Sequence, residues 1–510
     1  MTNDFKNEPS SYWLDGPQIP EFASLGGSIK TDIVIVGGGI VGITAAYLLR
    51  NSGRSVTVLE GGRLLHGTTG YTTAKLSVQH GLIYDELIGT FSEEDARQYY
   101  ETNRQAMDWA KSVTGELGID CGFETRPAYL YAESSTGEQK IEKEFEAYEK
   151  LEIPGASLTK QTDLPFPIRT ALKLEDQYQF HPVYFLAALV KEAQQAGVKF
   201  YENSRAKTVH MPSQVELVNG YTVDAQQVLV TSHFPFNDFE GLYFSRMRVE
   251  RSYAMTLRGN FKEDMGMYIN VESPTRSIRT VLDASGERLL QIGGEGHVSG
   301  RHEESTRNNY AKLRDFASSY FGTSEVTHNW SSQDLLPLDH LPYIGQMVTG
   351  MPHVFVATGF SKWGMSNGIA AAHVLSDLVL GKANPYEDLF SPTRTKLRPK
   401  GIGSFIKDNA GVAKELIKGK VTGAEANLDE LGLDDGKLVR VEGEKLAAYK
   451  DDNGYVTFLK PACTHMGCDV AFNQAERSWD CPCHGSRFSY SGDVLEGPAT
   501  QPLGQVHPKI

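Results

Sequence analysis

The sequence contains little cysteine and no long apolar run. Only 5 of its 510 residues are cysteine, and no stretch approaches the roughly 20 consecutive apolar residues that a membrane-spanning helix needs. Residues 1–16 show neither a basic start followed by an apolar run nor a twin-arginine pair, so they do not resemble an export signal. We therefore expect a soluble, cytoplasmic protein without a transmembrane segment.

Positive charge is also in deficit. The chain has 50 lysines and arginines against 64 aspartates and glutamates, which gives a formal net charge of -14 at pH 7. A negative surface repels phosphate backbones, and this argues against nucleic acid as a partner. The length exceeds what one hydrophobic core usually serves, so two or three domains are expected.

The few cysteines are crowded together. Four of the five lie between Cys463 and Cys483, and in a reducing compartment such crowding favours a metal site over a disulfide scaffold. Two motifs, Cys463-Thr-His465 and Cys481-Pro-Cys483-His484, each offer a thiolate and an imidazole. With this spacing one iron of a 2Fe-2S cluster takes the two sulfurs and the other takes the two histidines. Tetrahedral zinc is the alternative, because two cysteines and two histidines satisfy it as well.

The region 427–510 resembles the Rieske fold, a small all-β domain. The resemblance rests on both motifs and on Gly497-Pro498-Ala499, which stands where a loop covers the cluster in that family. It implies four ligands of the 2Fe-2S cluster: Cys463, His465, Cys481 and His484. It also implies a disulfide between Cys468 and Cys483, as in Rieske proteins of the respiratory-complex type.

A strand, a glycine turn and a helix open the N-terminal part. Residues 31–36 form a β-branched run typical of a buried parallel strand, and Gly37, Gly39 and Gly42 follow in Gly-x-Gly-x-x-Gly spacing. A helix and a second strand follow, and the βαβ unit ends at Glu60. Such glycines let the backbone approach a pyrophosphate, and the carboxylate holds ribose hydroxyls. The pattern predicts a dinucleotide site.

The segment 61–75 resembles the second flavin-contacting loop of the D-amino-acid oxidase and glycine oxidase superfamily, and 336–345 and 356–359 resemble two further blocks of it. This resemblance favours FAD over NAD. It implies an α/β FAD-binding domain of the glutathione-reductase-like Rossmann type with an α+β substrate domain. Tyr71 stands where some relatives attach flavin through histidine, so noncovalent FAD is expected. The residues expected to bind FAD are Gly37, Gly39, Gly42, Glu60, Arg63, Thr68, Thr69, Thr73, Gly359, Gly364 and Met365.

Three regions are expected along the chain. The first is an FAD-dependent oxidoreductase module over 1–382, the second a linker with one amphipathic helix over 383–426, and the third the Rieske domain over 427–510. Within the first, the parts expected to bind the nucleotide are about 30–95, 180–235 and 335–382. The parts expected to form the substrate domain are about 96–180 and 236–334.

Catalytic residues are not evident from the sequence. Lys362 and Trp363 lie in the 359–364 turn, ahead of a helix whose N-terminus would stabilise negative charge on reduced flavin. Arg251 and His297 lie in strand-like segments that reach the flavin face in relatives, where an arginine often holds a substrate carboxylate. For each of the four residues a purely structural role is the alternative. The sequence therefore does not assign the catalytic residues.

The two cofactors together predict an FAD-dependent dehydrogenase that acts on CH-NH or CH-NH2 donors. A small amine or amino acid would give a hydride to FAD, and electrons would pass singly to the Rieske cluster and then to an external acceptor protein or quinone. One alternative is a flavoprotein reductase that feeds a partner protein, although no second dinucleotide fingerprint occurs between 100 and 400. Another is a nonenzymatic redox sensor. A Rieske oxygenase is disfavoured, because the Asp expected before His297 and His302 is missing.

Overall fold

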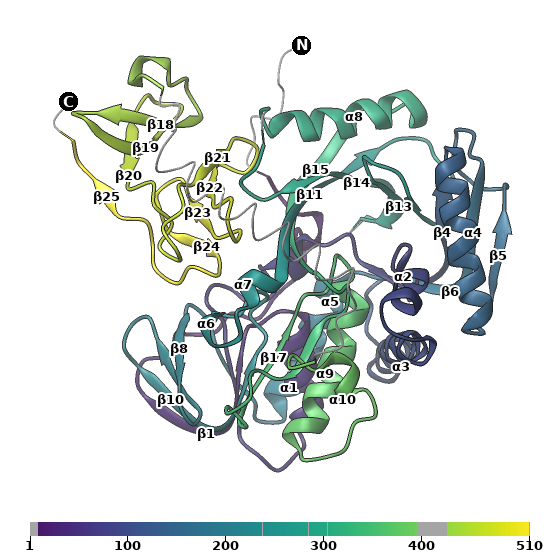
Figure 1. The fold of residues 1–510 in the computed structure, drawn as a ribbon, viewed down its shortest axis with the longest axis horizontal. Helices are drawn as coiled ribbons and strands as arrows, with labels where there is room; N and C mark the ends of the chain where they lie inside the picture. Colours follow the sequence, from purple (N-terminus) through teal and green to yellow (C-terminus); the bar gives the residue numbers. More distant parts are fainter. Residues whose placement is uncertain (1–8, 237, 284, 303, 395–425, 509–510) are drawn as a thin grey trace.

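The chain folds into a larger module that holds two sheets and a smaller all-β module beside it (Figure 1). The computed structural model describes residues 9–236, 238–283, 285–302, 304–394 and 426–508. The amphipathic helix expected near 405–417 lies outside the described residues. Among the residues that are described, no helix has both the length and the apolar character needed to cross a membrane.

The first sheet is eight-stranded and mostly parallel. Its central strand β1 (Ile29–Val36) pairs in parallel with β2 (Val56–Leu59) on one side and with β10 (Thr222–Val230) on the other. The other strands are β7 (Lys199–Tyr201), β17 (Val354–Thr358), the antiparallel edge strand β16 (Tyr343–Gln346), and the hairpin of β8 (Ala206–His210) and β9 (Gln214–Leu217).

Strand β1 is buried on both faces because apolar side chains alternate across it. Ile33 and Ile35 belong to the core that also holds helices α1 (Ile40–Leu49), α5 (Pro182–Gln195) and α9 (Gly364–Val379). Val34 and Val36 belong to the core on the other face, under the β8–β9 hairpin. This burial on both faces is typical of a parallel sheet, and it confirms the expected α/β fold of the first module.

The second sheet is nine-stranded and mainly antiparallel, and it forms the substrate domain. Its strands, in spatial order, are β15 (Glu325–Pro337), β11 (Met247–Arg258), β14 (Arg288–Val298), β13 (Arg276–Leu282), β12 (Met267–Asn270), β4 (Glu124–Ala132), β6 (Thr170–Gln179) and β3 (Lys75–Leu76), with β5 (Ala156–Thr159) paired to β6.

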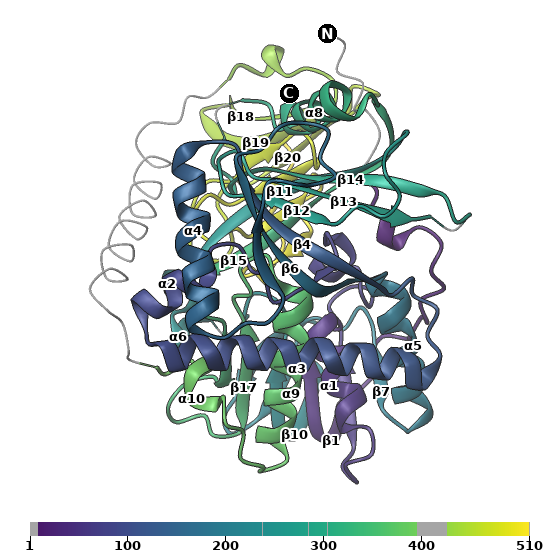
Figure 2. The same ribbon diagram turned by 90° about the vertical axis from the view of Figure 1, so that its right-hand side faces the viewer.

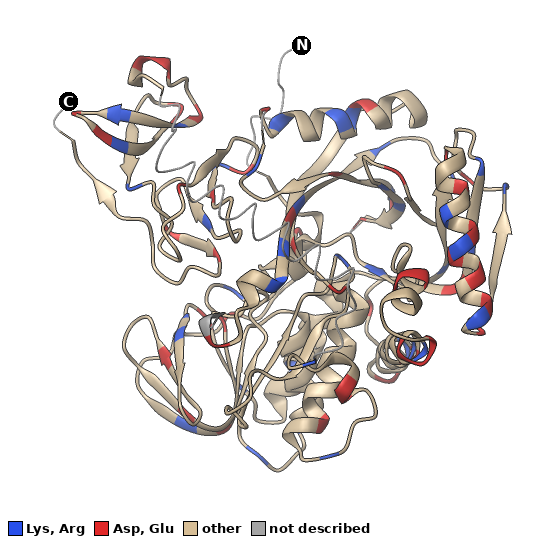
Figure 3. Cartoon of the chain, in the orientation of Figure 1, with Lys and Arg blue, Asp and Glu red and all other residues tan. Residues whose placement is uncertain are grey.

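Helices cover the outside of the larger module. The longest, α3 (Glu93–Leu117), begins at Ser92, whose hydroxyl accepts a hydrogen bond from the Asp95 amide at 3.1 Å, and it ends at Gly118 in the left-handed region. It packs against α9 (Figure 2), and α4 carries acidic and basic residues along its surface (Figure 3). The remaining helices are α2 (Ile83–Thr90), α4 (Ser135–Lys150), α6 (Asp238–Gly241), α7 (Tyr243–Arg246), α8 (Arg307–Phe321), α10 (Glu387–Phe390), and the 3-10 turns η1 (Tyr12–Leu14), η2 (Thr68–Tyr71) and η3 (Leu428–Glu430).

The smaller module consists of two four-stranded antiparallel sheets, as expected for the all-β domain (Figure 1). The 463–468 loop follows β20 and the 481–486 loop joins β22 to β23. The strands of the first sheet are β18 (Asp435–Val441), β19 (Glu444–Lys450), β20 (Val456–Leu459) and β25 (Gln505–Val506). Those of the second are β21 (Ala471–Asn473), β22 (Ser478–Asp480), β23 (Arg487–Ser489) and β24 (Val494–Glu496).

A buried network of two cations and two carboxylates joins the modules. Arg251 on β11 is fully buried, with Nη2 3.2 Å from Glu496 Oε2 and Nε 3.7 Å from Asp480 Oδ2. Arg487 reaches the same two carboxylates at 3.3 Å each. Burial works to raise the pKa of Glu496, but the charges of Arg487 and Arg251 outweigh it and leave the pKa below its ordinary value. The network is therefore charged and neutralised internally.

Two glycines allow the backbone of one module to approach the other module closely. A Cβ on Gly300 would lie 2.6 Å from the Pro482 nitrogen, and one on Gly485 would lie 2.4 Å from Val249 Cγ1. Both have positive φ, +68° and +74°, which also favours glycine. Nearby, Gln333 Nε2 donates to the Gly485 carbonyl at 2.8 Å. The 481–486 loop is thus held directly on the larger module.

Replacing Arg251 by methionine tests the network. Arg251→Met leaves two buried carboxylates with one cation, and breaking such a buried pair costs about 3–5 kcal/mol. The control is Arg248→Met on the same strand, where an exposed pair contributes less than about 1 kcal/mol. We expect calorimetry to show a clearly lower melting temperature for Arg251→Met alone; equal melting temperatures would contradict a holding role for the network.

Candidate active site

A cavity of about 770 Å³ runs from the glycine turn after β1 to the second sheet. At the nucleotide end, both oxygens of Glu60 accept backbone hydrogen bonds at 2.8 Å, from Gly38 and from Gly62. Burial raises the pKa of this carboxyl, and the two amide donors work against that rise. The Glu60 carboxylate is thereby fixed at the cavity wall.

The glycine turn leaves the space that a dinucleotide needs. Gly37 has a φ of +117°, and a Cβ there would lie 2.4 Å from the Thr231 carbonyl oxygen. A Cβ on Gly42 would lie 1.9 Å from the Gly37 oxygen. Gly39 precedes α1 and provides no side-chain cap; the Ile40 amide donates to Thr69 Oγ1 at 3.0 Å, and the positive N-terminal end of the helix favours an anion beside it. These residues fit the pyrophosphate of FAD.

The two cluster loops lie together in the smaller module, and the 481–486 loop faces the larger module. Cys468 and Cys483 are joined by a disulfide, so they offer no thiolate, whereas Cys463 and Cys481 are free and buried. A hydrogen bond from the Cys481 thiol is the main cause that holds the pKa of Cys463 below its ordinary value. The two free sulfurs therefore lie side by side.

The two histidines complete this donor set. The rings of His465 and His484 lie 5.1 Å apart between centroids. His484 is 3% exposed, and among the described residues its Nδ1 is buried without a hydrogen-bond partner. Burial lowers the pKa of His484 to about 3, so the imidazole is neutral, which is the form that binds metal. Two thiols and a buried, available imidazole nitrogen fit a 2Fe-2S cluster with mixed ligands.

Comparison with known proteins decides the family. Residues 32–378 match the family described as FAD dependent oxidoreductase (DAO), and residues 423–507 match the Rieske [2Fe-2S] domain. The chain belongs to the DAO family of FAD-dependent oxidoreductases. It carries a C-terminal Rieske domain, and its cofactors are FAD and a Rieske 2Fe-2S cluster.

Individual relatives agree with both halves. A Bacillus subtilis (strain 168) protein, YhfW, described as a Rieske 2Fe-2S iron-sulfur protein, is 40% identical over 503 residues, 98% of each chain. The chloroplast cytochrome b6-f complex iron-sulfur subunit of Pisum sativum is 34% identical over 142 residues, 26% of this chain and 58% of that one.

Solved structures share the fold of the larger module. Glycine oxidase from Geobacillus kaustophilus superposes with a TM-score of 0.58 at 19% identity, over 72% of this chain and 99% of that one. L-Proline dehydrogenase from P. horikoshii gives 0.59 at 18% identity, over 73% and 100%.

Most residues expected to bind FAD in this DAO-family protein line the cavity. They are Gly37, Gly39, Glu60, Thr68, Thr69, Thr73, Gly364 and Met365. Gly42 and Gly359 shape the turns behind it, since a Cβ on Gly359 would lie 2.6 Å from Pro337 Cγ. The Arg63 guanidinium pairs with Glu21 at 2.5 Å and is not among the cavity-lining residues, so its contact with FAD stays a prediction.

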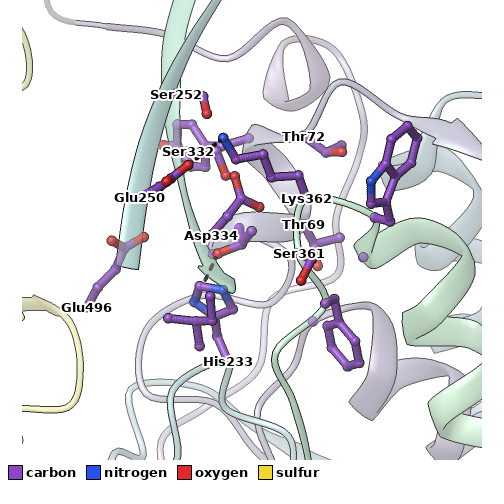
Figure 4. Close-up of a pocket in the computed structure, with 18 of the residues that line it drawn as sticks. Thr69, Thr72, His233, Glu250, Ser252, Ser332, Asp334, Ser361, Lys362 and Glu496 are labelled. Carbon is purple, nitrogen blue, oxygen red and sulfur yellow. Dashed lines mark hydrogen bonds and ion pairs between the residues drawn. The ribbon is translucent and has the colours of Figure 1, made fainter. Parts of the chain in front are cut away.

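Lys362 lies at the end of the cavity nearest α9. Ser361 and Lys362 both have positive φ, +50° and +72°, and the Lys362 Nζ lies 2.9 Å from Glu250 Oε2. Figure 4 shows Lys362 extending toward Glu250, with Asp334 beside it. Burial raises the pKa of Asp334 to about 6. Lys362 is therefore engaged by a carboxylate at the cavity wall.

Trp363 is fixed by a buried histidine. The Trp363 ring stacks on His80 at 4.8 Å between centroids. The His80 ring forms hydrogen bonds with Ser366 Oγ at 2.8 Å and with Tyr99 Oη at 2.6 Å. Burial lowers the pKa of His80 to about 3, so it is neutral. Trp363 lines the cavity at the start of α9. Because its ring is held by His80, this position suits a residue that shapes the cavity wall, not one that reacts with the substrate.

Arg251 and His297 do not line the cavity. The guanidinium of Arg251 binds Asp480 and Glu496 of the Rieske domain. It is therefore not available to hold a substrate carboxylate, which corrects that expectation. His297 bonds Tyr253 Oη at 3.0 Å through Nε2 and the Val298 carbonyl at 2.9 Å through Nδ1. Both are positioned by neighbours and have no access to a substrate in the cavity.

Several cavity residues were not singled out from the sequence. Glu250 and Asp334 lie on β11 and β15, and the 495–500 segment of the Rieske domain lines the same cavity. Both strands carry several polar and charged residues, so nothing in the sequence marked Glu250 or Asp334 as facing the cavity. The 495–500 segment includes Gly497-Pro498-Ala499, which the Rieske resemblance placed over the cluster, but its contact with the larger module depends on the tertiary fold.

The cluster ligands are open to a direct test. Cys481→Ser removes one sulfur ligand and should abolish the iron, the acid-labile sulfide and the electron paramagnetic resonance signal of the reduced protein. Cys121→Ser is the matched control, because Cys121 is also a free, buried cysteine but lies in the larger module. Zinc in place of iron and sulfide in the native protein would refute the cluster assignment.

Proposed function

We propose that this protein is a dehydrogenase that oxidises a small amine or amino acid in the cavity and delivers the electrons through its Rieske cluster to an external acceptor. FAD, when bound, accepts a hydride and releases electrons singly, whereas the cluster carries one electron at a time. The residues of the chain bind and orient the substrate, exclude water and join the two sites.

The observation that carries this proposal is the shared wall between the two sites. Gly497, Pro498 and Ala499 of the Rieske domain line the flavin cavity. The Ala499 amide donates to Ser486 Oγ at 3.0 Å, and Ser486 ends the 481–486 cluster loop. A single hydrogen bond thus links the cavity wall directly to a cluster loop. This arrangement supports electron transfer within the chain, without a diffusing carrier.

The charge of the cavity supports an amine donor. Glu250 and Asp334 line its second-sheet end, and the lysine beside them, Lys362, is already paired with Glu250. An excess of carboxylates attracts a cationic amine and disfavours an anion. Two solved structures with this fold are named as a glycine oxidase and an L-proline dehydrogenase, and we extend the amino-acid or amine class to this chain on that basis.

The two cluster loops differ in exposure. The 481–486 loop is buried against the larger module, whereas Thr464, Met466 and Gly467 of the other loop are exposed. Phe244 on α7 also covers the buried side, 5.0 Å from the His484 ring between centroids. We infer that electrons enter by the buried loop and leave by the exposed one. The acceptor, a protein or a quinone in the cytoplasm, would then approach near Met466.

An anaerobic substrate screen tests the proposed activity. We expect candidate amines and amino acids to bleach the flavin absorbance, and the reduced-cluster resonance signal to follow. NADH and NADPH are the comparison, because bleaching by either would favour a reductase that feeds a partner. No bleaching by any of these donors would leave a redox sensor as the better description.

The exit face has its own test. Met466→Glu places a charge beside the exposed cluster loop and should slow reduction of a water-soluble quinone or of cytochrome c severalfold, while substrate bleaches the flavin at the native rate. Tyr455→Glu is the control, since Tyr455 is also exposed but lies in the turn before β20. Equal rates for both variants would place the exit elsewhere.

A further inference from the structure

A buried lysine lines the cavity without a carboxylate partner. Lys75 on β3 is 7% exposed and lies in the cavity wall. Its Nζ donates to Ser277 Oγ on β13, and among the described residues no carboxylate lies within ion-pair distance of it. A buried ammonium without a counterion is unfavourable, so this position selects the neutral amine.

The nearest charge strengthens that preference. Arg279 donates to the carbonyl of Thr73 at 2.8 Å and to that of Ala74 at 2.5 Å, immediately before Lys75. Burial, together with the positive charge of Arg279, lowers the pKa of Lys75 to about 7. Near neutral pH about half of the Lys75 side chains are therefore free bases.

Other groups around Lys75 do not supply a counterion. The carboxylates on the surrounding strands are already engaged: Glu124 is held by Arg288 and Arg126 and by Gln179 Nε2 at 2.6 Å, Glu295, which also lines the cavity, pairs with Arg276, Glu175 pairs with Lys173, and Glu250 pairs with Lys362. The charged and titratable groups on the surrounding elements are Lys173, Glu175, Asp176 and Tyr178 on β6; Glu124, Arg126, Tyr129 and Tyr131 on β4; Arg276 and Arg279 on β13; Arg288, Glu295 and His297 on β14; Arg248, Glu250, Arg251, Tyr253 and Arg258 on β11; Tyr12 in η1; and His80 beyond β3.

The position of Lys75 belongs to the substrate end of the cavity. The cavity lining at this end also includes Leu130, Ile269 and Gly293 of the second sheet, whereas Glu60 lies at the nucleotide end. No side chain projects from Gly293, whose added Cβ would lie 3.7 Å from Ser277 Cβ. Lys75 therefore faces the open volume of the cavity, and the apolar side chains of Leu130 and Ile269 in the same lining also favour the neutral form of a bound amine.

We propose that Lys75 Nζ is the proton acceptor that converts the bound substrate from an ammonium ion to the free amine. An N–H bond of the substrate breaks, an N–H bond forms on Lys75, and no electrons are transferred. An aliphatic amine has a pKa of about 10.4 in water and arrives protonated. Only the free amine has the lone pair that stabilises the cation left when the neighbouring carbon loses a hydride. Ser277 is the positioning residue, and the inference rests on the proposed amine oxidation.

The test uses Lys75→Met and Lys75→Gln in the full-length protein, with Lys312→Met as a matched control at an exposed lysine outside the cavity. Because Lys75 is protonated below about pH 7, kcat/KM for anaerobic flavin bleaching should rise through that pH in the native protein. Loss of a general base lowers the rate on the order of 10²–10⁴-fold. We expect that loss in both Lys75 variants, with the acid limb moved toward the pKa of the substrate, and native behaviour in Lys312→Met.

A second measurement does not depend on turnover. In protein labelled with 13C at lysine Cε, one signal should titrate near pH 7 and should be absent from both Lys75 variants, whose melting temperature and FAD content verify folding. Absence of a signal titrating near pH 7, or a native rate and acid limb in both Lys75 variants, overturns the role of Lys75 and leaves amine oxidation standing. Failure of every amine to bleach the native flavin overturns both proposals.

Discussion

The buried network of Arg251, Asp480, Glu496 and Arg487 is the interaction on which the arrangement of both sites depends. Arg251 comes from the larger module, and the other three charges come from strands of the Rieske domain. Separating the modules would take Arg251 from both carboxylates and leave Asp480 and Glu496 with the single guanidinium of Arg487. The network therefore fixes the 495–500 segment in the cavity wall and the 481–486 loop on β11 and β15, so that a cofactor in one site is held near the other.

The chemistry that depends on short-range sequence was predictable. Cys463, His465, Cys481 and His484 sit in two short loops, where spacing alone determines which side chains converge. The Gly37 turn was equally predictable, because its positive φ is a property of the local backbone that favours glycine. The disulfide between Cys468 and Cys483, implied by the Rieske resemblance, is present in the structure. Strand and helix positions in the βαβ unit agreed within a residue or two.

What escaped the sequence depends on residues far apart in the chain. Arg251 resembled a substrate-binding arginine until the structure placed Glu496 beside it, 245 positions away. Lys75 stood in a segment chosen for its resemblance to a flavin loop, but its importance comes from burial and from Ser277, 202 positions away. Desolvation and pairing are properties of the assembled fold, and composition does not reveal them.

The backbone contacts at Gly300 and Gly485 have a consequence for how such a fusion is inherited. The Gly300 backbone lies against the backbone of Pro482 and the Gly485 backbone lies against the Val249 side chain, so even one methyl group on either glycine would overlap the other module. A Rieske domain transplanted from an unrelated protein would bring a surface shaped for a different neighbour. The two halves can therefore change only in concert, and the fusion behaves in evolution as one heritable unit, not as two exchangeable cassettes.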